Sequence, residues 1–205
     1  MNKEKYKEDL QEIKDIMNRT TRFISLSGLS GVSTGIIALA GTLSSYQTIF
    51  KGHHYLVYTS VELTDGSLKN LLLIAVATLI LSIGAAIFFT GRKTKQQKQS
   101  MWNNQTKELL FNLLIPLITG GLVCLIFLFK GFVGILAPFT LIFYGLALLN
   151  ASKYTLSEIR NLGLIEILLG LIAFLLIDFG LLFWAFGFGI VQIVYGIRIQ
   201  IKYKS

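Results

Sequence analysis

The chain has 205 residues, of which 53% are hydrophobic and only 15% are charged, and its mean hydropathy is +0.64. Soluble domains carry roughly 25% charged residues, so this composition argues against a water-exposed globule. The low charge also argues against a disordered chain, and the single cysteine excludes a disulfide scaffold. We therefore expect an integral membrane protein.

Six long apolar segments fit helices that cross a bilayer. A spanning helix needs about 20 mainly apolar residues to cross about 30 Å of hydrocarbon. The segments lack both the polar stripe of a surface helix and the alternation of a barrel strand. They cover residues 23–42, 71–90, 109–129, 132–150, 162–177 and 180–197. We expect an all-α, polytopic membrane protein with six transmembrane helices in three hairpins, formed by residues 23–200.

Basic residues are distributed unevenly between the gaps that separate these segments. Alternate gaps hold all but three of the 19 lysines and arginines, the exceptions being Lys51, Lys69 and Lys130. The positive-inside rule then places both termini, including the basic tail at 201–205, in the cytoplasm of a cell with a plasma (inner) membrane. The same charges are expected to attract anionic inner-leaflet lipids. This orientation explains the net charge of +8 without nucleic-acid binding, which we do not expect.

Residues 1–22 are expected to form a cytoplasmic amphipathic helix. Tyr6, Leu10, Ile13 and Met17 recur at helical spacing among charged residues and form one apolar stripe. The favoured interpretation is a helix that lies on the inner leaflet or extends the first span. The alternative is a docking helix for a cytoplasmic protein partner or a second subunit.

The loop at residues 43–70 carries the two histidines of the chain. His53 and His54 are adjacent, and ligands on a regular helix need separations of three or four residues to face one metal. No cysteine or carboxylate lies at a spacing that would complete a metal site. We favour an aromatic loop at the membrane interface over metal binding or pH sensing by this pair. No metal and no cofactor are expected.

Small residues recur along the first apolar segment. Ser27, Gly31 and Gly35 are four residues apart, and the last two form a GxxxG motif. Such residues let helix backbones approach closely inside a membrane. Packing against another span of the same chain is favoured, and self-association into a homo-oligomer is the alternative.

Glu166 is the one charged residue clearly inside an apolar segment. An ionisable group at the centre of a spanning helix costs about 2.5–3.5 kcal/mol on insertion scales, so it is a candidate functional residue. Gln192 lies at a comparable depth on the antiparallel sixth segment, where a hydrogen bond to Glu166 is expected, and Asn112 is a third candidate. If the possible capping box at residues 155–158 starts the helix earlier, Glu166 lies deeper. The favoured interpretation is a satisfied polar anchor, and the alternative is a protonatable site in a transport path.

A glycine-marked pattern runs through the fifth and sixth segments. It consists of residues 163–170, followed by Trp184, Gly187, Gly189, Tyr195 and Gly196. Over residues 105–200 the chain resembles the HdeD-like acid-resistance membrane proteins. The resemblance implies six spans in glycine-marked hairpins and a stress-related role, and it lends no catalytic residue. The chain departs from the family by carrying Asp178 where a proline often stands between the paired spans.

Sequence motifs of catalysis are absent. The chain has no GxSxG, no HExxH and no phosphate-binding glycine loop followed by lysine. We therefore expect a non-enzymatic membrane protein with a structural, regulatory or stress-response role. The alternative is a small transporter or channel for an ion, a proton or a small solute that uses Glu166.

Overall fold

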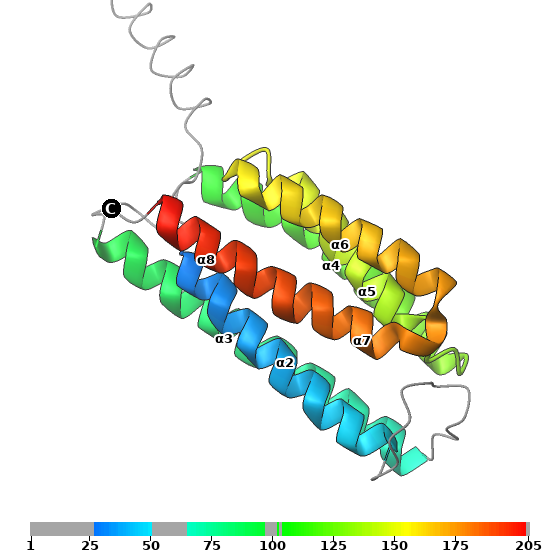
Figure 1. The fold of residues 1–205 in the computed structure, drawn as a ribbon. Coiled ribbons are helices and arrows are strands. Elements are labelled where there is room, and N and C mark those ends of the chain that lie inside the picture. Colours follow the sequence, from blue (N-terminus) through cyan, green and yellow to red (C-terminus); the bar gives the residue numbers. More distant parts are fainter. Residues whose placement is uncertain (1–26, 51–64, 97–101, 103, 204–205) are drawn as a thin grey trace, which may run out of the picture.

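The computed structural model describes residues 27–50, 65–96, 102 and 104–203 (Figure 1). The expected helix at residues 1–22 and the histidines His53 and His54 lie outside these residues. Every regular element in the described part is a helix, which confirms the predicted all-α class.

The described helices run from α2 to α8 along the chain. In chain order they are α2 (Gly28–Phe50), α3 (Asp65–Gln96), α4 (Asn104–Phe129), α5 (Leu136–Ala151), α6 (Ser157–Leu175), η2 (Ile177–Phe179), α7 (Gly180–Trp184), η3 (Ala185–Val191) and α8 (Gln192–Lys202). The short η2 is a 3-10 turn, and η3 is a π-helix that joins α7 directly to α8. We call the continuous helix α7–η3–α8 the C-terminal rod.

Each helix extends past at least one end of the apolar segment that predicts it, although α5 begins at Leu136, inside its segment at 132–150, and α6 ends at Leu175, before the end of its segment at 162–177. The segment at 71–90, for example, lies inside α3, which runs from Asp65 to Gln96. A helix satisfies its backbone hydrogen bonds internally, so it continues into the polar interface where the apolar run ends. Hydropathy therefore marks the part in hydrocarbon, and the helix itself is longer.

Four helical stretches in the described part are long and apolar enough to cross a membrane. They are α2, α3, α4 and the stretch Ile177–Lys202, which contains the C-terminal rod. Two of the six predicted spans fall outside this group. The helix α5 has only 16 residues, and α6 carries Glu158, Arg160 and Glu166 within its 19 residues. The result is a helical membrane protein with four long apolar helices and a shorter one.

The C-terminal rod lies between two groups of helices (Figure 1). On one side the rod packs against α2, which in turn packs against α3. On the other side α5 and α6 form a tightly packed hairpin, and α4 packs against α5. Buried apolar residues join this hairpin to the rod; they are Leu148, Leu156, Ile159, Leu162, Val191 and Ile199.

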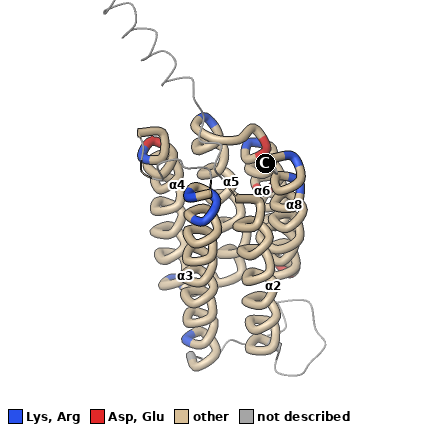
Figure 2. The backbone as a smooth tube through the Cα atoms, turned by 90° about the vertical axis from the view of Figure 1, so that its left-hand side faces the viewer, with Lys and Arg blue, Asp and Glu red and all other residues tan. Residues whose placement is uncertain are grey.

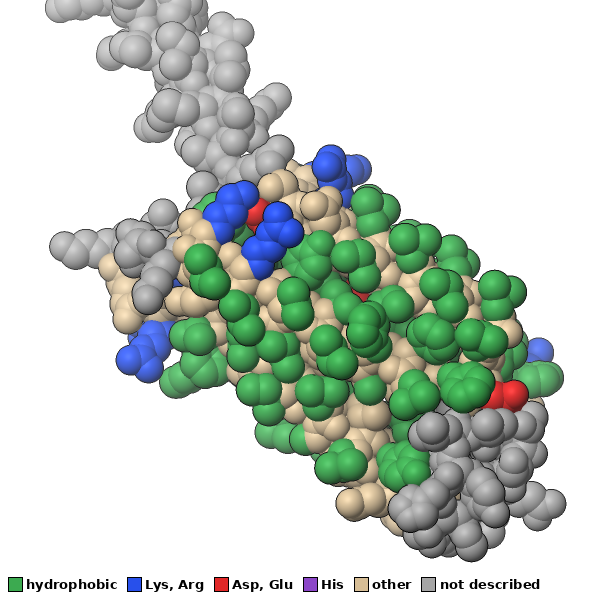
Figure 3. Space-filling view, in the orientation of Figure 1, with side chains coloured by type: hydrophobic (Ala, Val, Ile, Leu, Met, Phe, Trp, Pro, Cys, Tyr) green, Lys and Arg blue, Asp and Glu red, His purple; other side chains and the backbone are tan. Residues whose placement is uncertain are grey.

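Large apolar side chains cover the outside of the bundle (Figure 3). On α3, Leu79, Ile80 and Leu81 are each 60% exposed or more, and they are consecutive residues that point in different directions. Soluble proteins rarely expose such continuous apolar surface. This surface fits contact with lipid hydrocarbon.

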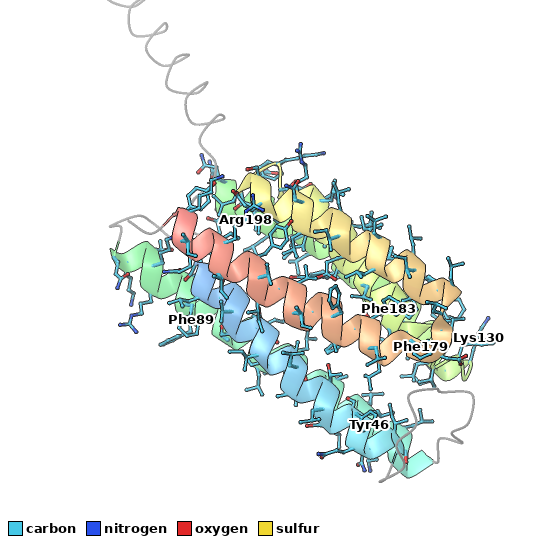
Figure 4. All side chains as sticks on the ribbon, in the orientation of Figure 1. Tyr46, Phe89, Lys130, Phe179, Phe183 and Arg198 are labelled. Atoms are coloured by element: carbon cyan, nitrogen blue, oxygen red, sulfur yellow. The ribbon has the colours of Figure 1, made fainter. Side chains whose placement is uncertain are left out.

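Lysine and arginine gather at one end of the bundle (Figure 2). Arg198 lies toward that end, whereas Lys130 lies at the opposite end (Figure 4). The last turn of α3, which carries Lys93 and Lys95, and the connection between α5 and α6 lie at this end of the bundle, so parts of the chain that are far apart in sequence meet there (Figure 1).

Candidate functional site

The most unusual polar group in the bundle is the carboxyl group of Glu166. This side chain has 0% relative exposure, and neither of its oxygens has a hydrogen-bond partner. The side-chain oxygen of Gln192 is also buried and has no partner. Buried polar atoms are almost always hydrogen-bonded in folded proteins, so three such oxygens near one another need a physical explanation.

Glu166 lies directly against the backbone of the π-helix. A Cβ atom built on Gly187 would lie 2.5 Å from Glu166 Oε2 and 2.6 Å from Leu141 Cδ2. The side chains of Glu166 from α6 and Leu141 from α5 therefore occupy the space that a side chain at position 187 would need. Glycine at this position brings α5, α6 and η3 together at the carboxyl group.

Tyr144 and Gln192 complete the surroundings of this carboxyl group. The backbone N–H of Gln192 donates to the carbonyl of Gly187, so Gln192 lies one turn along the rod from the point where Glu166 touches it. Tyr144 lies one turn after Leu141 on the same face of α5. Its hydroxyl interacts electrostatically with Glu166 and with the side chain of Gln192. We call Tyr144, Glu166 and Gln192 the carboxyl site.

Aromatic packing holds the tyrosine of the carboxyl site in place. The ring centroid of Tyr144 lies 4.8 Å from that of Phe188, and the ring centroid of Trp184 also lies 4.8 Å from that of Phe188. Both partners belong to the C-terminal rod. Sequence reasoning missed Tyr144 because nothing in its local pattern distinguishes it from the other aromatic residues of the apolar segments.

Three expectations about the polar residues are wrong. Glu166 and Gln192 do not form the expected hydrogen bond, since both carboxyl oxygens and the amide oxygen lack partners. Asn112 does not join them, because its amide donates to the carbonyl of Glu108 on its own helix at 2.9 Å. The reason is position: α4 packs chiefly against α5 and has no comparable contact with the rod. The helix α6 starts at Ser157, before the apolar run, so Glu166 lies deeper than that run implies. The capping box is nevertheless wrong, because Leu156 is the N-cap and the carboxylate of Glu158 binds Lys202 and Tyr203 instead.

The small-residue stripe of α2 contacts the C-terminal rod. A Cβ atom on Gly31 would lie 3.0 Å from the Cα atom of Gly196, and one on Gly35 would lie 2.8 Å from the carbonyl oxygen of Gly189. Ser27, at the start of the stripe, is buried, and its carbonyl accepts a hydrogen bond from Ser30. The GxxxG motif therefore packs within the chain, as the favoured interpretation expects.

A second polar cluster fastens α6 to α8 at the basic end. Lys202 Nζ donates to Glu158 Oε1 at 2.5 Å, and the Tyr203 hydroxyl donates to Glu158 Oε2 at 3.1 Å. Burial alone would raise the pKa of Glu158, but these hydrogen bonds outweigh it and hold the pKa below its usual value. The sequence does not reveal this pairing because the partners are far apart along the chain. We call these three residues the Glu158 clamp.

Metal-binding groups are sparse in the bundle. Within the described ranges, no three His, Cys, Asp or Glu side chains gather closely enough to hold a metal ion. The pair His53 and His54 lies outside those ranges.

Comparison with known proteins gives no further assignment. No family model, no curated protein and no solved structure matches this chain. The functional interpretation therefore depends on the geometry of the bundle, the carboxyl site and the Glu158 clamp.

Proposed function

We propose that the chain is a six-span protein of the plasma (inner) membrane with both termini in the cytoplasm. The helices α2, α3, α4, α5 and α6 and the C-terminal rod would each cross the bilayer once. The gathering of Lys and Arg at one end supports this orientation, because basic loops are retained in the cytoplasm (Figure 2). The short α5 fits a span whose ends are extended by the connection at residues 130–135.

Its function, we infer, is non-enzymatic and structural or regulatory. The observation that carries this inference is the close backbone packing, through glycine contacts, of the first and last described helices, α2 and α8. Glycine contacts of the same kind lock α5 to α6, where a Cβ atom on Gly145 would lie 2.6 Å from the carbonyl oxygen of Gly163. Backbones in direct contact leave little room for a path between these helices. Such a bundle suits a membrane scaffold or a partner of other membrane components.

Partners in this role would be anionic lipids, a second copy of the chain, or a cytoplasmic protein that binds residues 1–22. Each cation near an anionic leaflet contributes roughly 1 kcal/mol of attraction. We expect the purified protein to be more stable to heat in nanodiscs with phosphatidylglycerol than in nanodiscs with phosphatidylcholine alone. Equal stability in the two lipids at low salt would contradict the lipid part of the proposal.

Crosslinking in native membranes tests the scaffold role. We expect a photo-reactive residue within 1–22 to capture one reproducible protein partner or a second copy, and one on the lipid-facing surface of α3 to capture lipid. A chain that crosslinks only to lipid from both positions would contradict a scaffold role.

A second candidate function is transport of a proton or a small cation through the carboxyl site. The unpartnered oxygens of Glu166 favour it, because an acid without a partner inside a membrane is costly and is typical of ion pathways. Proteoliposomes carrying a pH-sensitive dye inside would report proton flux. This candidate requires flux with the wild type and with Glu108→Gln, which changes an exposed acid on α4, and none with Glu166→Gln. Wild-type leak equal to that of empty liposomes would exclude this candidate.

A further inference from the structure

The unpartnered atoms of the carboxyl site share one chemical property. Glu166 Oε1, Glu166 Oε2 and Gln192 Oε1 are all oxygens that accept hydrogen bonds or coordinate cations. An acceptor is satisfied by a proton, by a donor or by a cation, and three buried acceptors without a partner in the protein therefore mark a place that one of these can fill.

The charge of the site limits what it can hold. Glu166 is the acid of the site, whereas Gln192 is neutral and Tyr144 contributes a hydroxyl. One carboxylate neutralises one positive charge, and a divalent cation would leave a net charge in a buried apolar place. We propose that the carboxyl site binds a single monovalent cation, either a proton or an alkali metal ion, held by Glu166 and Gln192 with the Tyr144 hydroxyl beside them.

The backbone next to the site fits this assignment. Single turns of π-helix are rare and occur frequently at functional sites. Here the π-helix η3 presents Gly187 to the carboxyl group and sets Gln192 one turn further along the rod. The π-helix contacts the carboxyl group of Glu166 and fixes where Gln192 begins α8. It thus positions the Gln192 oxygen relative to the Glu166 oxygens, although the two residues belong to different helices.

This inference rests on the second candidate function and adds the charge of the ligand and the residues that hold it, but binding and flux are measured separately. A site that binds a cation without moving it would leave the inference standing and exclude transport. The experiment below therefore measures binding in purified protein rather than flux.

Two measurements on the full chain in nanodiscs distinguish the two cations. Thermal unfolding is followed in lithium, sodium, potassium and choline chloride at equal ionic strength, and infrared spectra are recorded as a function of pH. If an alkali ion binds, one of the three metal ions raises Tm above its value in choline by about 5–10 °C at a concentration near 100 times Kd. If a proton binds, the metal ions have no effect, and a carboxylic-acid C=O band is present at neutral pH and disappears at alkaline pH.

Matched variants assign either signal to the carboxyl site. Glu166→Gln should abolish the ion-dependent Tm shift or the titrating band, whereas Glu108→Gln should keep it. Gln192→Met removes the amide oxygen and keeps the side-chain length, and it should weaken ion binding or shift the midpoint of the band titration. If Glu166→Gln fails to fold, Gln192→Met serves as the informative variant. An ionised Glu166 at neutral pH together with a Tm that is indifferent to the metal ions would overturn the proposal.

Discussion

At the scale of single residues, the two buried acids of α6 have opposite surroundings. Glu158 receives hydrogen bonds from Lys202 and Tyr203, whereas the oxygens of Glu166 receive none. Both side chains are nearly or completely buried. We therefore expect the two positions to respond differently to the same substitution.

The Glu158 clamp should make the protein sensitive to acid. Its lowered pKa means that the carboxylate stabilises the fold above the pKa of the unfolded chain, about 4.3, and that this contribution is lost as the pH falls further. Replacing Glu158 by Gln should cost about 1–2 kcal/mol at neutral pH, since the partner Lys202 is itself 55% exposed. Unfolding curves in detergent at neutral and acidic pH measure both effects. The variant should lose the acid-dependent part of the stability; an unchanged acid profile would contradict the assignment to Glu158.

Replacing Glu166 by Met should be neutral or should stabilise the protein by about 1 kcal/mol, because the substitution removes a buried polar group that has no partner to lose. The same exchange at Glu158 should destabilise it, which provides the matched control. Thermal unfolding of both variants in choline chloride measures the difference. Strong destabilisation by Glu166→Met would instead support a polar anchor that fixes two helices.

The sequence predicts some of these residues and misses others for a clear reason. Glu166 stands out because a charge inside an apolar run is costly wherever the helix packs. Tyr144 and the Glu158 clamp depend on which helices become neighbours, and composition carries no information about that. The same limit explains the error over Asn112, whose depth along α4 is suitable but whose helix packs against α5 rather than against the rod.

At the scale of elements, glycine contacts determine which helices are neighbours. Gly196 of α8 lies against the backbone of α2, where an added Cβ atom would come within 2.8 Å of the carbonyl oxygen of Gly28. Gly84 of α3 has nothing within 4 Å of the same position. Both glycines lie within apolar helices, and they differ in whether another helix packs against them.

Substitution by alanine should therefore have opposite effects at these two positions. Gly196→Ala should destabilise the bundle by about 1–3 kcal/mol, because neither backbone can move aside easily. Gly84→Ala should stabilise it by about 0.5–1 kcal/mol through higher helix propensity. Thermal unfolding of the two variants beside the wild type provides the measurement. Equal effects at both positions would show that α2 and α8 do not pack as described.

The sequence predicts helical segments better than it predicts their ends or irregularities. Each of the six apolar runs overlaps a helix, because hydrocarbon leaves the backbone few alternatives, but their ends differ: α5 begins only at Leu136, although its run begins at 132. The π-helix η3 could not be predicted, since its residues are ordinary apolar and glycine residues whose geometry depends on the neighbours of the rod.

At the scale of the whole molecule, the uneven distribution of charge predicts which end faces the cytoplasm. We expect a cysteine at Lys130 to react with a membrane-impermeant maleimide from outside intact cells, and one at Lys153 to react only after the membrane is opened. Cys124, the native cysteine, is first replaced by serine. Labelling of both positions from the same side would contradict the proposed topology.

The contact between α2 and α8 also has a consequence for biosynthesis. The glycine face of α2 enters the membrane early, but its partner helix leaves the ribosome roughly 10–30 seconds later at typical rates of about 5–20 residues per second. During that interval the newly made hairpin must be shielded by lipid or by the insertion machinery. Completion of the last helix would then cover the glycine face of α2. Nascent chains halted before residue 189 should therefore leave that face exposed, where quality-control proteases can recognise it.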